Sequence, residues 1–310
     1  MTPVARPRRK ATSLARLASG WIAGGFGLLV VCLGGWWFTV AVGVIVHLGL
    51  LEFFRMAQFK GIRPATKTTL VAVQLLLLST QAAAGSGWPA QGVATDVAAA
   101  VLPASGAVIC GWLLLQPVTG TIADIAASIF GLFYLGFLPS HWIKLRDLCD
   151  PALAPRLAAL GHGWSSGLAL TLLACLLIVA TDIGGYVIGR RLGQHPLSPI
   201  SPGKTVEGAL GGVACAVLVG AGGGLLLGWR WGWLPGAALG AVVALFALVG
   251  DLTESMMKRD AGLKDSGDAI PGHGGILDRI DSHLFVPAVV YSLVTLLLPL
   301  LERQTIAIGG

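Results

Sequence analysis

Long apolar runs separated by short polar segments dominate this chain. Several runs reach about 20 residues, the length that an α-helix needs to cross the hydrocarbon core of a bilayer. The pattern predicts nine spans, at about 20–34, 36–58, 66–84, 94–115, 120–138, 165–188, 208–228, 234–254 and 283–301. Because a helix satisfies its own backbone hydrogen bonds in lipid, we expect an all-α, polytopic integral membrane protein.

The composition agrees with this fold class. Of 310 residues, 55% are hydrophobic and 12% are charged, which is more apolar than a typical soluble domain. The 44 glycines suit close packing between membrane helices. The five cysteines are scattered without metal-binding spacing, so neither a disulfide framework nor a zinc site is expected. No basic soluble domain studded with aromatic residues is present, so we expect no nucleic-acid partner.

The placement of basic residues predicts an orientation. Five arginines and lysines crowd residues 1–19, before an apolar block of nearly forty residues that is too long for the core of a signal peptide. The positive-inside rule then puts the N-terminus in the cytoplasm. Counting spans puts the basic loops 59–65, 189–207 and 255–282 on the same side. Loop 139–164 is also basic, yet the count places it outside, so either it is an exception or one span is misassigned.

Loop 255–282 gathers an unusual density of both charge signs. Asp278 and Asp281 are three residues apart, so they would share one face of a helix. Asp251 lies just upstream, where a carboxylate at a membrane boundary is costly unless it is paired or bound to a cation. Basic residues beside such carboxylates suggest Mg²⁺ with a phosphate substrate. Pro271 and the glycines that follow it interrupt any regular helix and can present backbone N–H groups to a phosphate.

A second polar segment begins at Asp182 and runs through Ser201-Pro202-Gly203-Lys204-Thr205. The Ser-x-Gly-Lys-Thr sequence lacks the first glycine of a phosphate-binding P-loop, because position 198 is Ser, and no strand precedes it. We therefore expect a polar turn between two spans, not a P-loop.

Together the two segments resemble a known family. The run Ser255-x-Met257-Lys258-Arg259-x₄-Lys264-Asp265-x-Gly267-x₂-Ile270-Pro271-x-His273-Gly274-Gly275-Ile276-x-Asp278-Arg279-Ile280-Asp281 resembles the signature of the phosphatidate cytidylyltransferase (CDP-diacylglycerol synthase) family. Residues 182–193 and 201–208 look like its second block, with Val206 where the family often has an aromatic residue. The likeness is strong over 165–285. In the N-terminal half it is limited to hydropathy and to the general look of Leu51-Glu52-Phe53-Phe54 and Gly136-Phe-Leu-Pro139-Ser140. It divides the chain into a basic cytoplasmic tail (1–19), an N-terminal transmembrane scaffold (20–164) and a C-terminal transmembrane catalytic domain (165–310).

The resemblance implies transfer of a cytidylyl group from CTP to phosphatidic acid, giving CDP-diacylglycerol and pyrophosphate. It implies a bacterial-type inner (plasma) membrane protein whose site faces the cytoplasm. It also implies Mg²⁺, with a second, monovalent cation such as K⁺. The partners would be CTP, phosphatidic acid and the lipid bilayer. We carry a homodimer as a further expectation, although the sequence does not decide the oligomeric state.

The resemblance also implies roles for particular side chains. The expected metal ligands are Asp251, Asp278, Asp281 and Asp182. The expected phosphate-binding cations are Lys204, Lys258, Arg259, Lys264 and Arg279. Ser201, Thr205, Glu207, Asp265, Gly274 and Gly275 would shape the substrate pocket, and His273 would act as an acid or base.

Purely structural roles stay open for four of these residues. Asp281 could pair with Arg279 or Lys258, and Asp182 with Arg190 or Arg191. His273 could hold the glycine-rich turn, and Ser201 could cap a helix.

Three other functions compete with this interpretation. A transporter of anionic solutes would spread its ionisable residues across the membrane depth, whereas here they concentrate in two loops of the C-terminal half. A lipid phosphotransferase that uses a nucleotide-activated lipid would carry an Asp-Gly-x₂-Ala-Arg motif, which is absent. A related cytidylyltransferase acting on another lipid phosphate would share these motifs, so they do not separate it from the leading interpretation.

Overall fold

The computed structural model describes residues 24–85, 97–150, 153–159, 161, 163–229, 231–267 and 274–297. Within them the protein is mostly helical. The elements are α2 (Gly35–Phe59), α3 (Thr66–Gly85), α4 (Val97–Leu114), α5 (Ile122–Leu132), η1 (Phe133–Phe137), α6 (Leu138–Arg146), α7 (Ala154–Ala159), α8 (Ser166–Leu192), β1 (Pro196–Ser198), β2 (Ser201–Thr205), α9 (Val206–Leu227), α10 (Trp233–Asp260), α11 (Leu277–Leu284), α12 (Val286–Ser292) and η2 (Leu293–Leu297).

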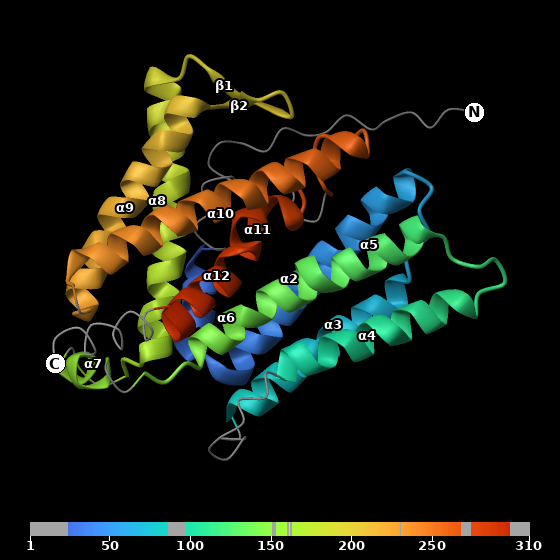
Figure 1. Ribbon diagram of the computed structural model, residues 1–310, viewed down its shortest axis with the longest axis horizontal. Coiled ribbons are helices and arrows are strands. Elements are labelled where there is room, and N and C mark those ends of the chain that lie inside the picture. The colour runs from blue at the N-terminus through green and yellow to red at the C-terminus, as the bar shows by residue number, and fades with distance from the viewer. Residues whose placement is uncertain are drawn as a thin grey trace, which may run out of the picture.

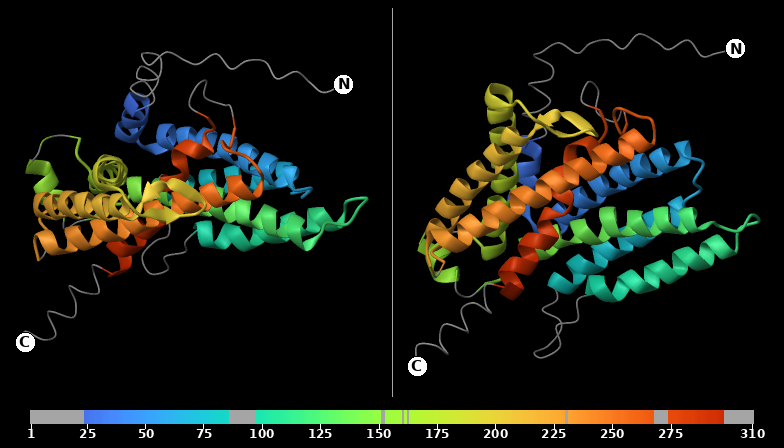
Figure 2. Two further views of the ribbon diagram at one scale, coloured as in Figure 1. Left: turned by 90° about the horizontal axis from the view of Figure 1, so that it is seen from above. Right: turned by 45° about the horizontal axis from the view of Figure 1, so that its top comes forward.

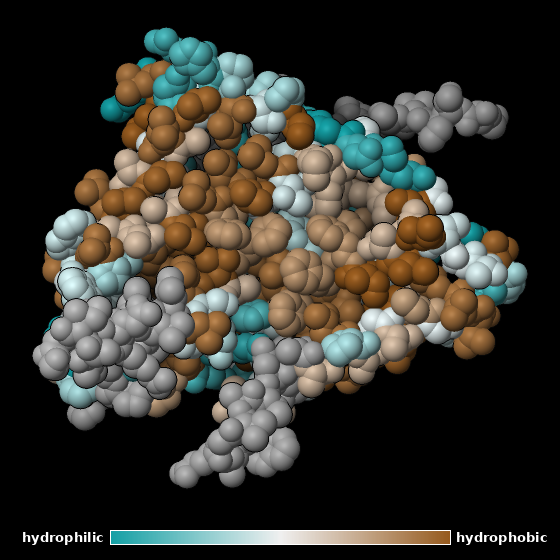
Figure 3. Space-filling model, viewed as in Figure 1, coloured by the Kyte–Doolittle hydropathy of each residue, from teal (hydrophilic) through white to brown (hydrophobic). Residues whose placement is uncertain are grey.

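Five helical stretches in the described part are long and apolar enough to cross a membrane. They are Gly35–Phe59, Ile122–Arg146, Ser166–Leu192, Val206–Leu227 and Trp233–Asp260. Helices also lie at the other four predicted positions, but they are shorter or less apolar. Figure 3 shows a broad hydrophobic band across one face, with hydrophilic residues gathered along its upper edge. The helical membrane fold is therefore confirmed, while the number of nine spans stays a prediction.

The helices form two groups with a short pair of helices between them. Helices α8, α9 and α10 pack together, and α2 to α6 make up the other group (Figure 1). Helix α11 contacts α10 on one side and α2 on the other, and α12 contacts α6. The turned views of Figure 2 show the same order. This arrangement puts the signature helix α11 at the boundary of the two groups.

Glycine allows the α8–α9–α10 group to pack closely, as the composition suggested. A Cβ added at Gly220 would meet the backbone of Gly236, and one added at Gly236 would meet that of Gly220. The turn between α9 and α10 begins at Gly228, whose φ of 63° is left-handed. Close contact of this kind is the main source of helix association in lipid, where burial of apolar surface gives no advantage.

Polar residues that the hydropathy pattern placed in loops are partly helical, and three predicted loops need correction. Loop 255–282 is helical at both ends, since α10 continues to Asp260 and α11 begins at Leu277. Loop 189–207 includes the end of α8 and an unpredicted antiparallel hairpin, β1–β2. Loop 139–164 is shortened because α6 runs to Arg146. The helical ends of all three loops have a common cause. A helix that leaves the lipid can continue with polar side chains, and the hydropathy pattern does not detect this polar continuation.

Candidate active site

A polar cavity of about 640 Å³ lies where α8, α9, α10, α11 and β2 meet. It brings together the two polar segments that the sequence singled out. Its charged lining comprises Asp182, Arg190, Lys204, Asp251, Asp278, Arg279 and Asp281. The structure therefore places Lys204 in the same cavity as the acidic residues of the C-terminal signature.

Lys204 and Asp251 are in direct contact. The Lys204 ammonium forms an ion pair with the Asp251 carboxylate, and each side chain keeps about a quarter of its surface exposed (29% and 25%). Lys204 lies on β2, which pairs with β1 in the register Pro196 to Thr205. The hairpin thus holds a cation against α10 at Asp251.

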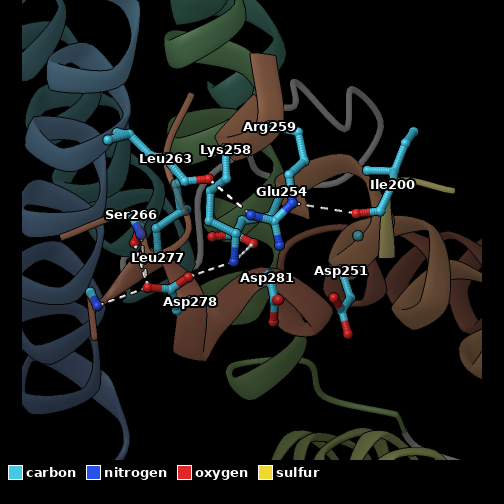
Figure 4. A network of polar contacts seen from close by, with 12 residues as sticks. Ile200, Asp251, Glu254, Lys258, Arg259, Leu263, Ser266, Leu277, Asp278 and Asp281 are labelled. Atoms are coloured by element: carbon cyan, nitrogen blue, oxygen red, sulfur yellow. Dashed lines mark hydrogen bonds and ion pairs between the residues drawn. The ribbon is translucent and has the colours of Figure 1, made fainter. Parts of the chain in front are cut away.

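Asp251 and Asp281 face the same space. Figure 4 shows their carboxylates pointing the same way, while Asp278 turns toward Lys258 and Ser266. Asp281 accepts a hydrogen bond from the Ser282 amide at 2.7 Å. Burial, and then the charge of Asp251, raise the pKa of Asp281 to about 7. A carboxylate whose pKa is raised by a neighbouring carboxylate favours a cation between the two.

The donor set fits a cation that completes its coordination with substrate. Among the described residues, no three His, Cys, Asp or Glu side chains lie close enough to hold a metal by themselves. Mg²⁺, however, is often bound by one or two carboxylates together with substrate phosphates and water. Asp251 and Asp281, with Asp182 on the same cavity wall, provide that kind of partial site.

Asp278, which we expected to bind metal, has a different set of partners. Its carboxylate accepts hydrogen bonds from Lys258 Nζ at 2.6 Å, the Ser266 amide and hydroxyl at 3.0 Å each, and the Gly275 amide at 2.8 Å. Burial raises the pKa of Asp278, but these hydrogen bonds lower it to about 2. The carboxylate is ionised and connects Lys258 and Ser266 to Gly275, so we interpret it as a positioning group.

Lys258 lies between two carboxylates and is not among the described residues that line the polar cavity. Its ammonium is 2.5 Å from Glu254, whose side chain is fully buried, and 2.6 Å from Asp278. Sequence reasoning missed Glu254, although its position four residues before Lys258 on a helix could have indicated the pair. This buried triad fixes α11 against α10.

Glu52 on α2 is the second residue to which the sequence analysis gave no role at the site. It is 3% exposed and lies in the other helix group. Its carboxylate accepts hydrogen bonds from Ser266 Oγ at 3.0 Å, the Ile276 amide at 3.0 Å and the Leu277 amide at 2.9 Å. These amides are at the start of α11, where a negative charge is favourable. A carboxylate inside an apolar span is itself a signal of function, and it could have drawn attention to Glu52.

The signature glycines have structural duties in this arrangement. A Cβ on Gly275 would overlap Ser266 and Glu52, and Gly274 has a left-handed φ of 83°. We expected these glycines to approach a ligand, but the close neighbours found for Gly275 belong to the protein. His273 lies outside the described residues.

The remaining predicted residues surround the hairpin and the end of α10. Thr205 caps α9 by accepting a hydrogen bond from the Gly208 amide at 3.1 Å, the capping role that we had considered for Ser201. Ser201 instead begins β2 and pairs with Ser198. Glu207 contacts the His195 ring at 2.5 Å.

Three other predicted residues lie at or just after the end of α10. Arg259 is in its last turn, and Lys264 and Asp265 are on the segment that follows. Arg259 donates to the Leu263 carbonyl at 3.1 Å. Lys264 is exposed and Asp265 half-buried, on the segment after α10. Neither Arg259 nor Lys264 lines the polar cavity in the part of the chain that the structure describes.

Comparison with known proteins identifies the relatives of this chain. The model of the cytidylyltransferase family matches residues 14–297. The chain belongs to this family. The match also extends well beyond 165–285, the part in which the motifs alone were recognisable.

Three curated relatives illustrate the similarity. A phosphatidate cytidylyltransferase of Synechocystis is 48% identical, over 91% of this chain and 96% of the relative. Phosphatidate cytidylyltransferase 4, chloroplastic, of Arabidopsis thaliana is 36% identical, over 87% and 71%. The phosphatidate cytidylyltransferase of Bacillus subtilis is 31% identical, over 91% and 97%. The family match therefore includes the N-terminal helices as well as the C-terminal ones.

Proposed function

We propose that this integral membrane protein transfers the cytidylyl group of CTP to phosphatidic acid, giving CDP-diacylglycerol and pyrophosphate. One observation carries the proposal: Lys204 of the hairpin, Asp251 of α10, and Arg279 and Asp281 of α11 line one polar cavity. They do so in a chain that aligns along most of its length with phosphatidate cytidylyltransferases.

The reaction needs positioning and charge neutralisation more than a protein nucleophile. An oxygen of the lipid phosphate forms a bond to the α-phosphorus of CTP, and the bond from that phosphorus to the bridging oxygen breaks. Pyrophosphate leaves with the electron pair. A lipid phosphate is already ionised near pH 7, so the attack requires no general base.

Charged side chains of the cavity have distinct parts in this scheme. Lys204 and Arg279 bind phosphate oxygens and neutralise charge that builds on the transferring group. Asp251, Asp281 and Asp182 would hold Mg²⁺, with K⁺ as a candidate for a second site. When bound, Mg²⁺ would neutralise the triphosphate and favour departure of pyrophosphate. Asp278, Lys258 and Glu52 keep α11 in place.

The proposal includes a location. We infer nine spans in a bacterial-type inner (plasma) membrane, with the cavity facing the cytoplasm, where CTP is available. Support comes from the ion pair of Lys60 and Asp260 at 3.1 Å, which sets the basic loop 59–65 beside the end of α10. That loop and the hairpin loop carry the positive charge expected of the cytoplasmic side. A homodimer stays part of the proposal.

The test uses purified protein in detergent with radiolabelled CTP, Mg²⁺ and dioleoyl phosphatidic acid. We expect labelled CDP-diacylglycerol and one pyrophosphate for each molecule formed. Parallel reactions with lysophosphatidic acid and with a polyprenyl phosphate test a related cytidylyltransferase. The proposal is wrong if phosphatidic acid gives no product while another lipid phosphate does, or if none reacts although the protein binds CTP.

A further inference from the structure

A second cavity, of about 390 Å³, adjoins the polar one. It lies against α2, α6, α8, α11 and the helix Gly24–Leu33. Its lining is largely apolar and includes Phe38, Val42, Trp142 and Leu172. The volume falls within the range of about 300–1,000 Å³ that is usual for ligand sites.

The two cavities share a wall. Arg279 and His283 of α11 line both of them. Asp281 and Ser282 line only the polar cavity, and Ile280 and Leu284 line only the apolar one. Because successive helical residues turn by about 100°, a single short helix can present a polar face and an apolar face to two adjoining spaces. Helix α11 therefore separates a compartment for charged groups from one for hydrocarbon.

Polar groups mark the junction between the compartments. The Arg279 side chain is exposed. The Nδ1 atom of His283 is buried and has no hydrogen-bond partner among the described residues. The Trp142 indole, which lines the apolar cavity, donates to the His283 carbonyl at 3.1 Å. A buried polar atom without a hydrogen-bond partner is unfavourable. A ligand that brings a polar group to this junction would give the Nδ1 atom of His283 a partner.

We propose that the apolar cavity holds the acyl chains of the lipid substrate, with the lipid phosphate at Arg279 and directed into the polar cavity. The inference rests on the proposed function. A nucleotide must stay in a polar space and acyl chains in an apolar one, so their reaction requires the two spaces to meet. A guanidinium suits the meeting point, because it can bind a phosphate with two parallel hydrogen bonds.

The test fills the cavity with a larger side chain. Leu172 lines it, whereas Leu176, one turn along the same helix, is 53% exposed and does not. Leu172→Trp should raise KM for dioleoyl phosphatidate at least about fivefold, since an overfilled cavity excludes hydrocarbon. KM for CTP and the rate with dihexanoyl phosphatidate should change less than about twofold. Leu176→Trp is the matched control and should resemble the wild type in every assay. The proposal is overturned if Leu172→Trp keeps wild-type KM for the long-chain lipid, or loses both lipids equally while remaining folded.

A measurement on the unaltered protein covers the case in which Leu172→Trp does not fold. Phosphatidate carrying a photoreactive diazirine midway along an acyl chain should label residues of α2 and α8 that line the cavity. Unlabelled phosphatidate should suppress this labelling, and phosphatidylcholine should not. Labelling confined to outward positions such as Leu176, or equal suppression by both lipids, would overturn the proposal. Failure of the wild type to form CDP-diacylglycerol would instead count against the proposed function, while the labelling still reports on the cavity.

Discussion

The two helix groups carry charge in different ways. In the C-terminal group, α8 to α10, and in the adjoining helix α11, charged side chains line a cavity and pair with one another. In the N-terminal group, residues 24–150, a buried carboxylate at Glu52 reaches across to the signature loop. The comparison is sharpest between two buried glutamates. Glu254 is neutralised by Lys258, a cation one helical turn away, whereas Glu52 is satisfied by backbone amides of a distant segment.

This difference assigns separate tasks to the two groups. In the proposed reaction, one group provides the side chains that touch phosphate, and the other holds them in place. Figure 4 illustrates the consequence: Asp278 is occupied with loop contacts, while Asp251 and Asp281 remain directed toward the cavity. Four sets of substitutions can break or sharpen this division, and they are ordered from the largest expected effect to the smallest.

The largest effect is expected at Lys258. Lys258→Met would leave Glu254 and Asp278 buried without their cation, and breaking such a pair costs about 3–5 kcal/mol. We expect a marked fall in melting temperature in detergent, measured by differential scanning fluorimetry. The double variant Lys258→Met/Glu254→Gln should recover part of it. Unchanged melting in the single variant would show that the triad does not hold α11.

Asp251→Asn and Asp281→Asn test where the chemistry takes place. Loss of a group that stabilises charge in the transition state lowers kcat about 10²–10³-fold, and we expect this range with melting close to the wild type. Incorporation of radiolabelled CTP into lipid measures it. Asp260→Asn is the matched control, because Asp260 is on the same helix as Asp251 but is exposed and pairs with Lys60. If both cavity variants retain more than about a tenth of the activity, the assignment of the site is wrong.

Glu52 tests whether the N-terminal group contributes to the site. Glu52→Ala leaves the amides of Ile276 and Leu277 without an acceptor, whereas the Ser266 hydroxyl can still donate to Asp278. A buried unsatisfied group costs about 1–3 kcal/mol. We expect kcat to fall about tenfold with little change in KM for CTP. Glu52→Gln keeps one acceptor oxygen and should lose less.

The control for Glu52 is Gln58→Ala, an exposed position on the same helix. If Glu52→Ala had wild-type kcat, the N-terminal group would be only a scaffold. A loss of melting temperature without any change in kcat would have the same meaning.

The smallest effect is expected on the hairpin. His195 pairs with Glu207, and 75% of the His195 side chain is exposed. Exposed ion pairs contribute about 0–1 kcal/mol to stability. His195→Ala should therefore raise KM for CTP by less than about fivefold in steady-state assays. A larger rise would mean that the hairpin positions the nucleotide more firmly than this contact suggests.

Much of the architecture could be predicted from sequence because lipid imposes a simple requirement. Apolar runs become helices, and the nine expected positions coincide with helices in the described residues. Asp278 and Asp281 were placed in a loop, but both lie on helix α11, where their spacing of three puts them on one face. The polar ends of helices were taken for loops, because the hydropathy pattern responds to the change of solvent and not to the end of a helix.

Local patterns were enough to name the candidate residues of the site, but not to assign a role to each of them. Spacing places Lys258 and Asp278 among polar neighbours without revealing that they bind each other. Glu52 accepts a hydrogen bond from the amide of Leu277, which is 225 residues further along the chain. No local pattern encodes a contact of that range.

The sequence by itself therefore determined the membrane class, the family and the set of charged groups, since each depends on composition or on short motifs. Only the tertiary structure decided which carboxylates face the cavity, which cation is confined in a triad, and how α11 divides a polar space from an apolar one. The physical reason is that a charge in a low-dielectric interior is governed by the partners that packing brings to it.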